Sequence, residues 1–506
     1  MMARGMDLTV KSWPAGRGGA PRLSWDAVMI GLFLLASALF LFPDAEVTPI
    51  VLWDESRNVV NALEMQRTGW SLVTTYEGQP DLWNTKPPLL IWLMSASVSL
   101  FGPSEWALRL PSALAALATL LMLLLFTRRV TGSLATACFA AGVLLLSPGF
   151  FGEHGARTAD YDALLVFFTT LYFFALFWAV TRRRPGVRLA AVAGLAIAGA
   201  FLTKSVAGLV PGTGVALYLL ATGRLGRLVA SRHYLLMGAA AAVPILLFLV
   251  AREGTAAGYI GAMLHNDAAT RFSRSVVGRD NPWWFYLQEI ATGWFVAGPL
   301  LLLAPFGWRA VRGKSRLLLL YCLCGCAAPL LVLSLSATKL SHYMLPIFPL
   351  LGIAAALLLR GVLRTILGAA LQGRRRVALV LLCALAAVPL AARAGQWRYV
   401  EFPERASEPQ ARYGRLLAAL ERLGVLEANA VDGGFTLEGR PHYVPLVRAY
   451  QLMWQDRVEI THVPAIDAAR AGLHVSCDPI MVEALLQLGR DMSDVPGCAA
   501  VALPER

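Results

Sequence analysis

The sequence is poor in charged residues. Only 15% of its 506 residues are charged, whereas a soluble domain has roughly a quarter. At the same time 57% of the residues are hydrophobic, and the mean hydropathy is +0.58. The apolar residues fall in blocks near the length of about 20 that a helix needs to cross a bilayer. This composition excludes an ordinary soluble protein and predicts a membrane protein that crosses the bilayer several times.

Acidic residues are scarcer than basic ones. The chain has 32 Asp and Glu against 45 Lys and Arg, which gives a formal net charge of +13. The arginines stand in short clusters between apolar blocks, for example at 128–129, 182–184 and 374–376. Such clusters mark the cytoplasmic ends of membrane helices. Because they account for the excess charge, we expect no nucleic-acid partner.

Cysteine is also rare, with seven in the chain. The Cys-x-Cys-x-Cys motif at 322–326 suggests metal binding, but it lies inside an apolar run, where cysteine behaves as a small hydrophobic residue. Cys477 and Cys498 lie apart from it, near the C-terminus. In an oxidising compartment these two can form a disulfide, and two free thiols are the alternative.

The arginine clusters also set the expected topology. With the basic N-terminal tail inside, only one crossing fits between residue 44 and the cluster at 128–129. The block at 88–101 is short and follows two prolines, so we expect an interfacial or re-entrant helix there. The remaining pattern gives about eleven spans, with the N-terminus inside and the C-terminus outside. The apolar blocks lie at about 26–43, 88–101, 107–126, 134–150, 161–181, 189–202, 206–221, 235–251, 284–306, 317–335, 343–359 and 377–392.

These considerations divide the chain into three parts. Residues 1–25 form a cytoplasmic tail, and the apolar run after them is expected to be an uncleaved first span rather than a signal peptide. Residues 26–392 form the transmembrane part, with a large outer loop at 44–87. Residues 393–506 have ordinary polarity, and their pattern predicts a small α/β domain on the periplasmic side. Its expected helices are at 406–423 and 479–488, and its expected strands at 457–463 and 472–476.

The first outer loop carries polar residues at both ends. Asp54 and Glu55 open a segment with helical spacing, where acidic residues complement the helix dipole. That explanation suits Glu55 better than Asp54, which stands at the exit of the first span. At the other end, Lys86 precedes Pro87-Pro88, which hold an ammonium at the membrane surface. Such a lysine either anchors the next helix or binds a phosphate at headgroup depth.

Further polar residues fall at the outer ends of later spans. Arg157 and Asp160 precede an apolar helix, where Asp160 suits an N-cap, whereas Asp162 lies inside that helix and needs another explanation. Lys204 interrupts an apolar hairpin and needs a carboxylate or a phosphate nearby. The remaining candidates are His265, Asn266, Arg271, Lys339, His342 and Tyr343. Together these groups fit an anionic lipid headgroup and a general base better than a conduction path.

The order of these motifs resembles a known family. It runs Asp-Glu after the first span, Lys-Pro-Pro-Leu, a later Asp opening a helix, Thr-Lys, His-Asn with Arg-Phe, and Lys-Leu followed by Tyr and Pro. The same order is found in GT-C glycosyltransferases of the protein O-mannosyltransferase and aminoarabinose-transferase (ArnT-like) superfamily. The resemblance covers most of residues 50–355, and the C-terminal part resembles these proteins only in its placement.

The resemblance implies inverting transfer of a sugar from a polyprenyl-phosphate donor, at the periplasmic face of a bacterial inner membrane. It assigns Asp54 to positioning or deprotonating the acceptor, with Asp162 as the second essential carboxylate. Glu55, beside Asp54, is kept as a further catalytic candidate. The groups that it assigns to the donor phosphate are Lys86, Arg271 and Tyr343.

The implied chemistry requires no metal or other cofactor, because lysine and arginine side chains can stabilise the leaving phosphate. A divalent metal is compatible with it but not implied. The expected partners are the lipid-linked sugar donor, an envelope acceptor (lipid, protein or glycan) and membrane lipids. Alternatives are a flippase or transporter of lipid-linked sugars, a non-catalytic scaffold and, within the enzymes, a lipid A aminoarabinose transferase.

Overall fold

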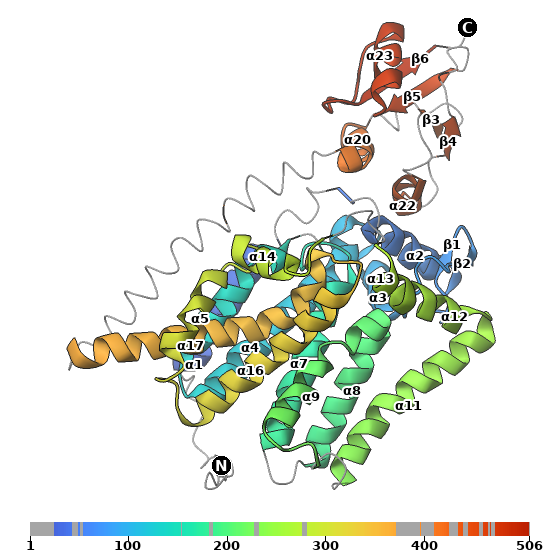
Figure 1. The fold of residues 1–506 in the computed structure, drawn as a ribbon. Coiled ribbons are helices and arrows are strands. Elements are labelled where there is room, and N and C mark those ends of the chain that lie inside the picture. Colours follow the sequence, from blue (N-terminus) through green and yellow to red (C-terminus); the bar gives the residue numbers. More distant parts are fainter. Residues whose placement is uncertain are drawn as a thin grey trace, which may run out of the picture.

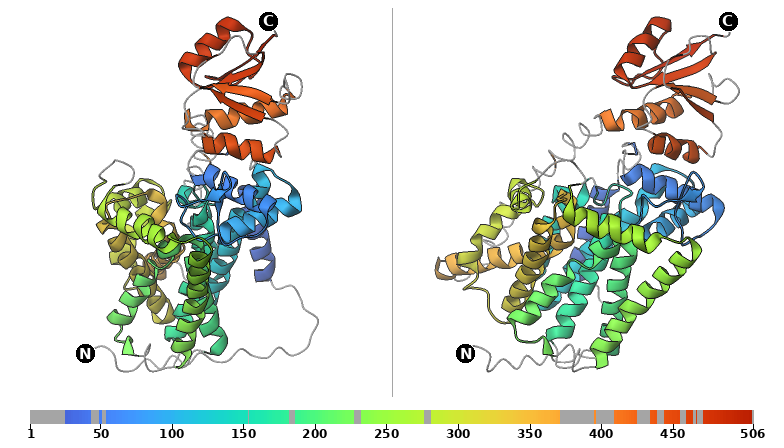
Figure 2. Two further views of the ribbon diagram at one scale, coloured as in Figure 1. Left: turned by 90° about the vertical axis from the view of Figure 1, so that its right-hand side faces the viewer. Right: turned by 45° about the vertical axis from the view of Figure 1, so that its right-hand side comes forward.

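The computed structural model shows a bundle of apolar helices with a small α/β part beyond one of its ends (Figures 1 and 2). The structure describes residues 25–42, 49–50, 54–152, 154–181, 186–226, 232–275, 281–370, 395, 409–424, 434–438, 444–454, 459–463, 466 and 471–504. All structural statements below concern these residues.

The bundle confirms a polytopic helical membrane protein. Among the described residues, 6 helices are long and apolar enough to cross a membrane. They are α4 (Glu105–Thr131), α7 (Tyr161–Thr181), α8 (Val187–Lys204) with the 3₁₀ turn η1 (Ser205–Gly208), α11 (Arg232–Thr255), α16 (Gly313–Leu335), and the 3₁₀ turn η4 (Ser341–Ile347) with α17 (Phe348–Ala370). Shorter apolar helices are α1 (Trp25–Leu41), α3 (Leu89–Phe101), α5 (Leu134–Leu145) and α9 (Gly212–Ala221). The number of about eleven spans stays a prediction, and its block at 377–392 lies outside the described residues.

One predicted apolar block is not a single continuous helix. The block at 284–306 consists of α14 (Phe285–Thr292), the 3₁₀ helix η3 (Gly298–Leu303) and α15 (Ala304–Gly307). The first break falls at Gly293, whose φ of +122° lies outside the helical region. Pro299 and Pro305 follow, and each lacks the N–H that a continuing helix needs.

The arginine-rich helix ends gather at one end of the bundle. Arg128, at the end of α4, pairs with Asp26 of α1. Arg360 of α17 donates to the carbonyl oxygen of Thr131, and Arg224 donates to that of Val180. The loops with the candidate site residues lie at the opposite end (Figure 1). The arginine clusters and the candidate site residues thus lie at opposite ends of the bundle, as the sequence predicts.

The opposite end carries a layer of short elements. Helix α2 (Asp54–Thr68) packs on α3 and on the hairpin of β1 (Thr75–Tyr76) and β2 (Gln79–Pro80). Both carboxylate oxygens of Glu64 tie α2 to this hairpin, through Thr75 Oγ1 at 2.7 Å and the Glu77 N–H at 2.7 Å. Nearby are α6 (Pro148–Phe151), α12 (Tyr259–Met263), the π-helix η2 (Leu264–Ala269) and α13 (Thr270–Ser273).

The C-terminal part is α/β, as the sequence predicts. Its sheet has the order β4-β3-β5-β6, in which β3 is parallel to β4 and β5 while β6 is antiparallel to β5. The strands are β3 (Gly434–Glu438), β4 (Glu459–Val463), β5 (Gly472–Ser476) and β6 (Ala499–Leu503), and the helices are α20 (Pro409–Arg422), α22 (Val444–Met453) and α23 (Pro479–Leu488). Cys477 and Cys498 form a disulfide between the end of β5 and the start of β6.

This α/β part docks on the end of the bundle that carries α2. The hydroxyl of Tyr450 donates to Glu105 at 3.2 Å and accepts from the Ile50 N–H at 3.1 Å. Arg67 of α2 donates to the carbonyl oxygen of Leu452 at 2.8 Å. The C-terminal part therefore lies on the same side of the bundle as the candidate site residues (Figure 2).

Candidate active site

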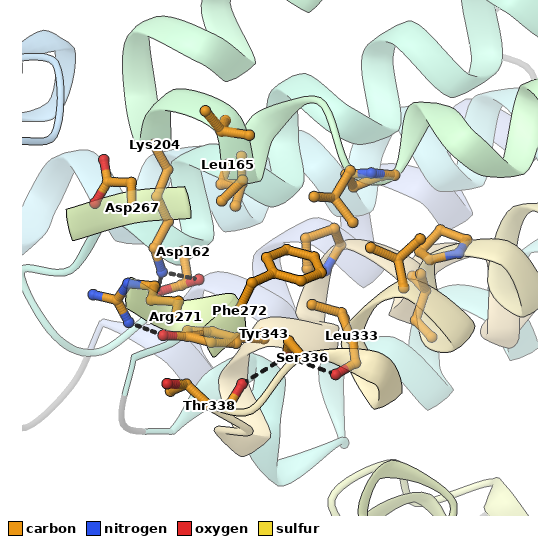
Figure 3. Close-up of a pocket in the computed structure, with 18 of the residues that line it drawn as sticks. Asp162, Leu165, Lys204, Asp267, Arg271, Phe272, Leu333, Ser336, Thr338 and Tyr343 are labelled. Atoms are coloured by element: carbon orange, nitrogen blue, oxygen red, sulfur yellow. Dashed lines mark hydrogen bonds and ion pairs between the residues drawn. The ribbon is translucent and has the colours of Figure 1, made fainter. Parts of the chain in front are cut away.

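A cavity of about 100 Å³ opens at this end of the bundle, between α7, η1, α13, α16 and η4 (Figure 3). One part of its wall is charged, and the other is apolar. The charged and polar lining includes Lys86, Asp162, Lys204, Asp267, Arg271 and Tyr343. The apolar lining includes Val206, Val210, Pro211, Pro329, Val332 and Leu333. Four of the residues predicted for the donor phosphate and the second carboxylate thus line one cavity.

The carboxylate of Asp162 is held by the ammonium of Lys204. Both Asp162 oxygens accept from Lys204 Nζ at 2.7 Å. The pair forms because α7 and α8 run side by side, so that the first turn of α7 meets the last turn of α8. The expectation that Lys204 needs a nearby carboxylate or phosphate is confirmed.

Arg271 and Tyr343 form a second pair in the same cavity. The Arg271 guanidinium donates to the Tyr343 hydroxyl and lies 5.7 Å from the ring centroid. Lys204 Nζ lies 5.7 Å from the same ring. The Thr338 N–H donates to the Arg271 carbonyl oxygen at 2.9 Å, which fixes α13 against the segment that leads into η4. Two cations therefore flank one phenol.

Lys86 is positioned by an amide network in the first outer loop. Its Nζ lies 3.5 Å from Asn84 Oδ1 and 5.7 Å from the Tyr161 ring centroid. Asn84 Nδ2 in turn has the Tyr161 hydroxyl at 3.0 Å and Asn61 Oδ1 at 2.9 Å. Asp81 accepts from the Asn84 N–H at 3.1 Å. The ammonium of Lys86 is thus brought to the cavity by a hydrogen-bonded loop.

Asp54 opens α2, and its side chain is half-buried. Burial alone would raise the pKa of its carboxyl group, but the charges of Lys86, His154, Lys204 and Arg271 outweigh burial and lower it. Asp54 is therefore an ionised carboxylate within electrostatic reach of the three cations that line the cavity.

Glu55 faces away from the cavity. Its oxygens accept from Arg109 Nε at 2.7 Å and Nη2 at 2.9 Å, and Oε1 also accepts from the Ala159 N–H at 2.9 Å. Glu55 and Arg109 are each 2% exposed, so their charges are fully committed to one another. The geometry gives Glu55 a role in holding α2 against α4. Catalytic roles for Glu55 and Asp54 stay predictions.

Asp160 is buried immediately before α7. Its Oδ2 accepts from Thr158 Oγ1 at 2.7 Å and lies 3.5 Å from His154 Nδ1. Burial raises the pKa of this carboxyl group to about 7; the positive charge of His154 opposes the rise, and the negative charges of Asp54 and Glu55 add to it. Asp160 is thus a carboxyl group that titrates near neutral pH.

The other candidates lie around the cavity rather than in its wall. His342 is buried, and its ring stacks on that of His154 with 4.0 Å between centroids. Lys339 donates to the Ser336 carbonyl oxygen at 2.7 Å, and Asn266 donates to that of Leu82 at 3.2 Å. Arg157 is buried in the turn before α7, and His265 is exposed on η2.

Sequence reasoning missed two residues of this site. Asp267 lines the cavity and accepts from Ser205 Oγ at 2.6 Å and from Thr85 Oγ1 at 3.3 Å. Asp267 directly follows His265 and Asn266. Extending the His-Asn motif by one residue would have included it. His154 lies between Gly152 and Gly155 in a segment that the predicted topology places outside. A histidine in such an outer loop was the sequence feature that could have identified it.

Three described residues have a geometry that a metal ion can use. His154, Asp162 and His342 each place one ligand atom within 4.8 Å of the others. However, both Asp162 oxygens already accept from the Lys204 ammonium, and Lys86 and Arg271 line the same cavity. A dication there would meet three positive charges, so these residues fit a metal poorly. The metal-free chemistry of the site stays a prediction.

Comparison with known proteins supports the resemblance. The dolichyl-phosphate-mannose-protein mannosyltransferase family matches residues 85–251. An undecaprenyl phosphate-alpha-4-amino-4-deoxy-L-arabinose arabinosyl transferase 2 from Pseudomonas fluorescens is 28% identical over 62% of this chain and 53% of its own length. The lipid A galacturonosyltransferase RgtD from Rhizobium johnstonii is 29% identical over 46% of each chain. The chain thus spans about half the length of these curated relatives.

The fold has a match over nearly its whole length. The crystal structure of ArnT from Cupriavidus metallidurans bound to undecaprenyl phosphate superposes with a TM-score of 0.67. The superposition covers 94% of this chain and 98% of ArnT, at 19% identity. At this identity the likeness concerns the fold alone. The chain is therefore similar in sequence to polyprenyl-phosphate-sugar glycosyltransferases over part of its length, and it has the fold of ArnT over nearly all of it.

Proposed function

We propose that the chain is an inverting glycosyltransferase, which moves a sugar from a polyprenyl-phosphate donor to an envelope acceptor at the periplasmic face of the bacterial inner membrane. The observation that carries this proposal is the division of the cavity wall. Lys86, Lys204 and Arg271 lie at its charged part, and the apolar part runs along η1, the turn before α9, and α16. Figure 3 shows Lys204 and Arg271 on the charged side. Such a cavity suits an amphiphile with an anionic head and a prenyl tail.

The charges fit the proposed reaction. The bond between the anomeric carbon and the phosphate oxygen breaks, and negative charge builds up on the departing phosphate. Cations fixed before the reaction stabilise that charge in a poorly solvated site. Asp54 is ionised and lies near these cations, which suits a group that positions the acceptor or stabilises positive charge at the reacting carbon.

The disulfide supports the proposed orientation. Disulfides persist in oxidising compartments such as the periplasm. The Cys477–Cys498 bond belongs to the α/β part that docks on the end of the bundle with the cavity. We therefore place the C-terminal part and the cavity on the periplasmic side, and the arginine-rich end in the cytoplasm.

A transfer assay with purified protein tests the function. Undecaprenyl phosphate carrying radiolabelled mannose, galacturonate or 4-amino-4-deoxy-L-arabinose serves as donor, and envelope extracts supply acceptors. We expect transfer from one of these donors with inversion at the anomeric carbon, and an Asp54→Asn variant at least about 10²-fold slower. No transfer by the wild type, or an Asp54→Asn variant as fast as the wild type, contradicts the proposal. Movement of the intact donor across vesicles without transfer would favour a flippase.

A further inference from the structure

His154 occupies an unusual backbone position beside the cavity. Its φ of +59° lies in the left-handed region, which costs energy for a residue with a side chain. The turn around it is held by the N–H of Gly155 on the Gly152 carbonyl at 3.0 Å and by that of Ala156 on the Phe150 carbonyl at 2.9 Å. A Cβ at position 155 would lie 2.3 Å from the Phe150 carbonyl oxygen, so this tight turn requires glycine there. The turn therefore fixes the direction of the His154 ring.

The ring of His154 is oriented by its neighbours. Nδ1 faces Asp160 Oδ2 at 3.5 Å, and the ring stacks on His342 with an interplanar angle of 26°. With Nδ1 toward Asp160, Nε2 lies on the opposite side of the ring. The His154 side chain is 24% exposed whereas that of Asp160 is 4% exposed, so the imidazole can reach a ligand that the carboxyl group cannot.

The charged and titratable groups around His154 come from α7 and the turn before it, from α2 and from η4. Asp160 precedes α7, Asp162 lies in its first turn, Asp54 opens α2 and His342 belongs to η4. The cations Lys86, Lys204 and Arg271 act on the same group of residues. These cations lower the pKa of Asp54, which makes Asp54 a weak proton acceptor. An imidazole is better suited to take a proton near neutral pH, and the Asp160 carboxyl group lies beside Nδ1 of His154.

We propose that His154, oriented by the positioning residue Asp160, removes the proton of an acceptor hydroxyl group, and that the acceptor is therefore a hydroxyl rather than a phosphate. This inference rests on the proposed glycosyltransferase function and names its acceptor class. A phosphate acceptor is already ionised at neutral pH and has no proton that the reaction must remove.

The acceptor oxygen forms a bond to the anomeric carbon, and its O–H bond breaks, with the proton going to Nε2 of His154. The bond from the anomeric carbon to the donor oxygen breaks, and its electron pair leaves with the polyprenyl phosphate. The imidazolium is stabilised by the negative charge of Asp54, and its own charge favours the ionised form of Asp160. Because the His154 side chain is partly exposed, the imidazolium then returns its proton to solvent.

The experiment compares two acceptors with the full-length protein in nanodiscs. The donor is whichever of the three radiolabelled undecaprenyl-phospho-sugars the wild type uses, and the acceptors are an alkyl glycoside and an alkyl phosphate. His154→Asn is the main variant, because asparagine tolerates a left-handed backbone better than most residues. His154→Gln and Asp160→Asn accompany it. His233→Asn, at the far end of α11, is the matched control.

We expect transfer to the alkyl glycoside, with kcat about 10²- to 10⁴-fold lower in both His154 variants and the donor KM changed by less than about twofold. In a plot of wild-type rate against pH, the rate should rise as His154 loses its proton. This rising limb should be absent in the His154 variants. In Asp160→Asn the limb should move to lower pH, because an imidazolium without its carboxylate loses its proton more easily. A merely structural role for Asp160 would not move it.

Two results would overturn the inference while leaving the glycosyltransferase function intact. One is transfer by the wild type to the alkyl phosphate and not to the alkyl glycoside. The other is transfer to the glycoside at the wild-type rate by His154→Asn or His154→Gln. Binding of undecaprenyl phosphate by each variant shows that it is folded. Failure of the wild type to use any donor would instead contradict the proposed glycosyltransferase function itself.

Discussion

Both carboxylate oxygens of Asp162 accept hydrogen bonds from the ammonium of Lys204, at 2.7 Å each, with side chains only 3% and 11% exposed. The pair joins the start of α7 to the end of α8 at the wall of the cavity. A charge pair this well buried is costly to break on one side, since the remaining charge stays desolvated. The pair therefore binds two helices together and also supplies a cation to the site.

Breaking this pair on one side should destabilise the protein more than removing both charges. Lys204→Met and Asp162→Asn should each lower the melting temperature, with a cost of about 3–5 kcal/mol. The double variant should recover most of that loss but should not recover transfer, because the cavity then lacks one of its cations. Thermal unfolding and the transfer assay on the same samples measure both. Additive losses of stability would show that the pair is not coupled.

From the sequence it was predictable that a buried charged side chain requires a partner of opposite charge. Which residue is that partner was not always predictable. Lys204 at the end of an apolar segment required an anion, and the antiparallel packing of α7 and α8 selects Asp162. Glu55 could be set apart from Asp54, yet its partner Arg109 lies inside a predicted span. No local pattern joins two residues that meet through tertiary packing.

The same limit applies to the elements. Strand 472–476 and helix 479–488 were predictable because period and turn residues act locally. The break at Gly293 was not, because the apolar composition of 284–306 is the same for one long helix and for three short ones. His154 escaped notice for a related reason, since its site depends on His342, far along the chain.

Lys86 should contribute to donor binding, whereas Lys339 should not. Lys86 lines the cavity. Lys339 is not among the lining residues, and its ammonium donates to the Ser336 carbonyl oxygen. Lys86→Met removes a charge-assisted contact with the phosphate worth about 1.5–3 kcal/mol, so the Kd for undecaprenyl phosphate should rise roughly 10- to 100-fold. Lys339→Met should change it less than about twofold. Equal effects of the two substitutions would contradict the assignment of the cavity.

Asp160 should make stability depend on pH in the direction opposite to Asp81. The raised pKa of Asp160, about 7, means that the folded state favours its protonated form; its contribution is complete below the ordinary value of 3.8 and is lost as the pH rises through 7. Asp160→Asn should therefore gain stability relative to the wild type between pH 5 and pH 8, by about 2 kcal/mol.

Asp81 provides the matched comparison. Burial would raise the pKa of its carboxyl group, but hydrogen bonds from Arg57 and Asn61 lower it, so its contribution is present above the ordinary value and is lost in acid. Asp81→Asn should be less stable than the wild type at both pH 5 and pH 8. Melting temperatures of the three proteins across this range provide the measurement. A constant difference between Asp160→Asn and the wild type would show that Asp160 does not titrate there.

The Cys477–Cys498 disulfide gives a test of both stability and orientation. It closes a loop with a sequence separation of 21 residues, and its loss should cost about 2–4 kcal/mol. A Cys477→Ser/Cys498→Ser variant should therefore lose the cooperative unfolding of the α/β part at lower temperature, whereas Cys138→Ser, at a free thiol in α5, should not. In intact cells, a maleimide that cannot cross the inner membrane should label these two cysteines only after reduction from outside. Labelling that requires lysis of the inner membrane would place the α/β part in the cytoplasm, and with it the end of the bundle that holds Lys86, Lys204 and Arg271.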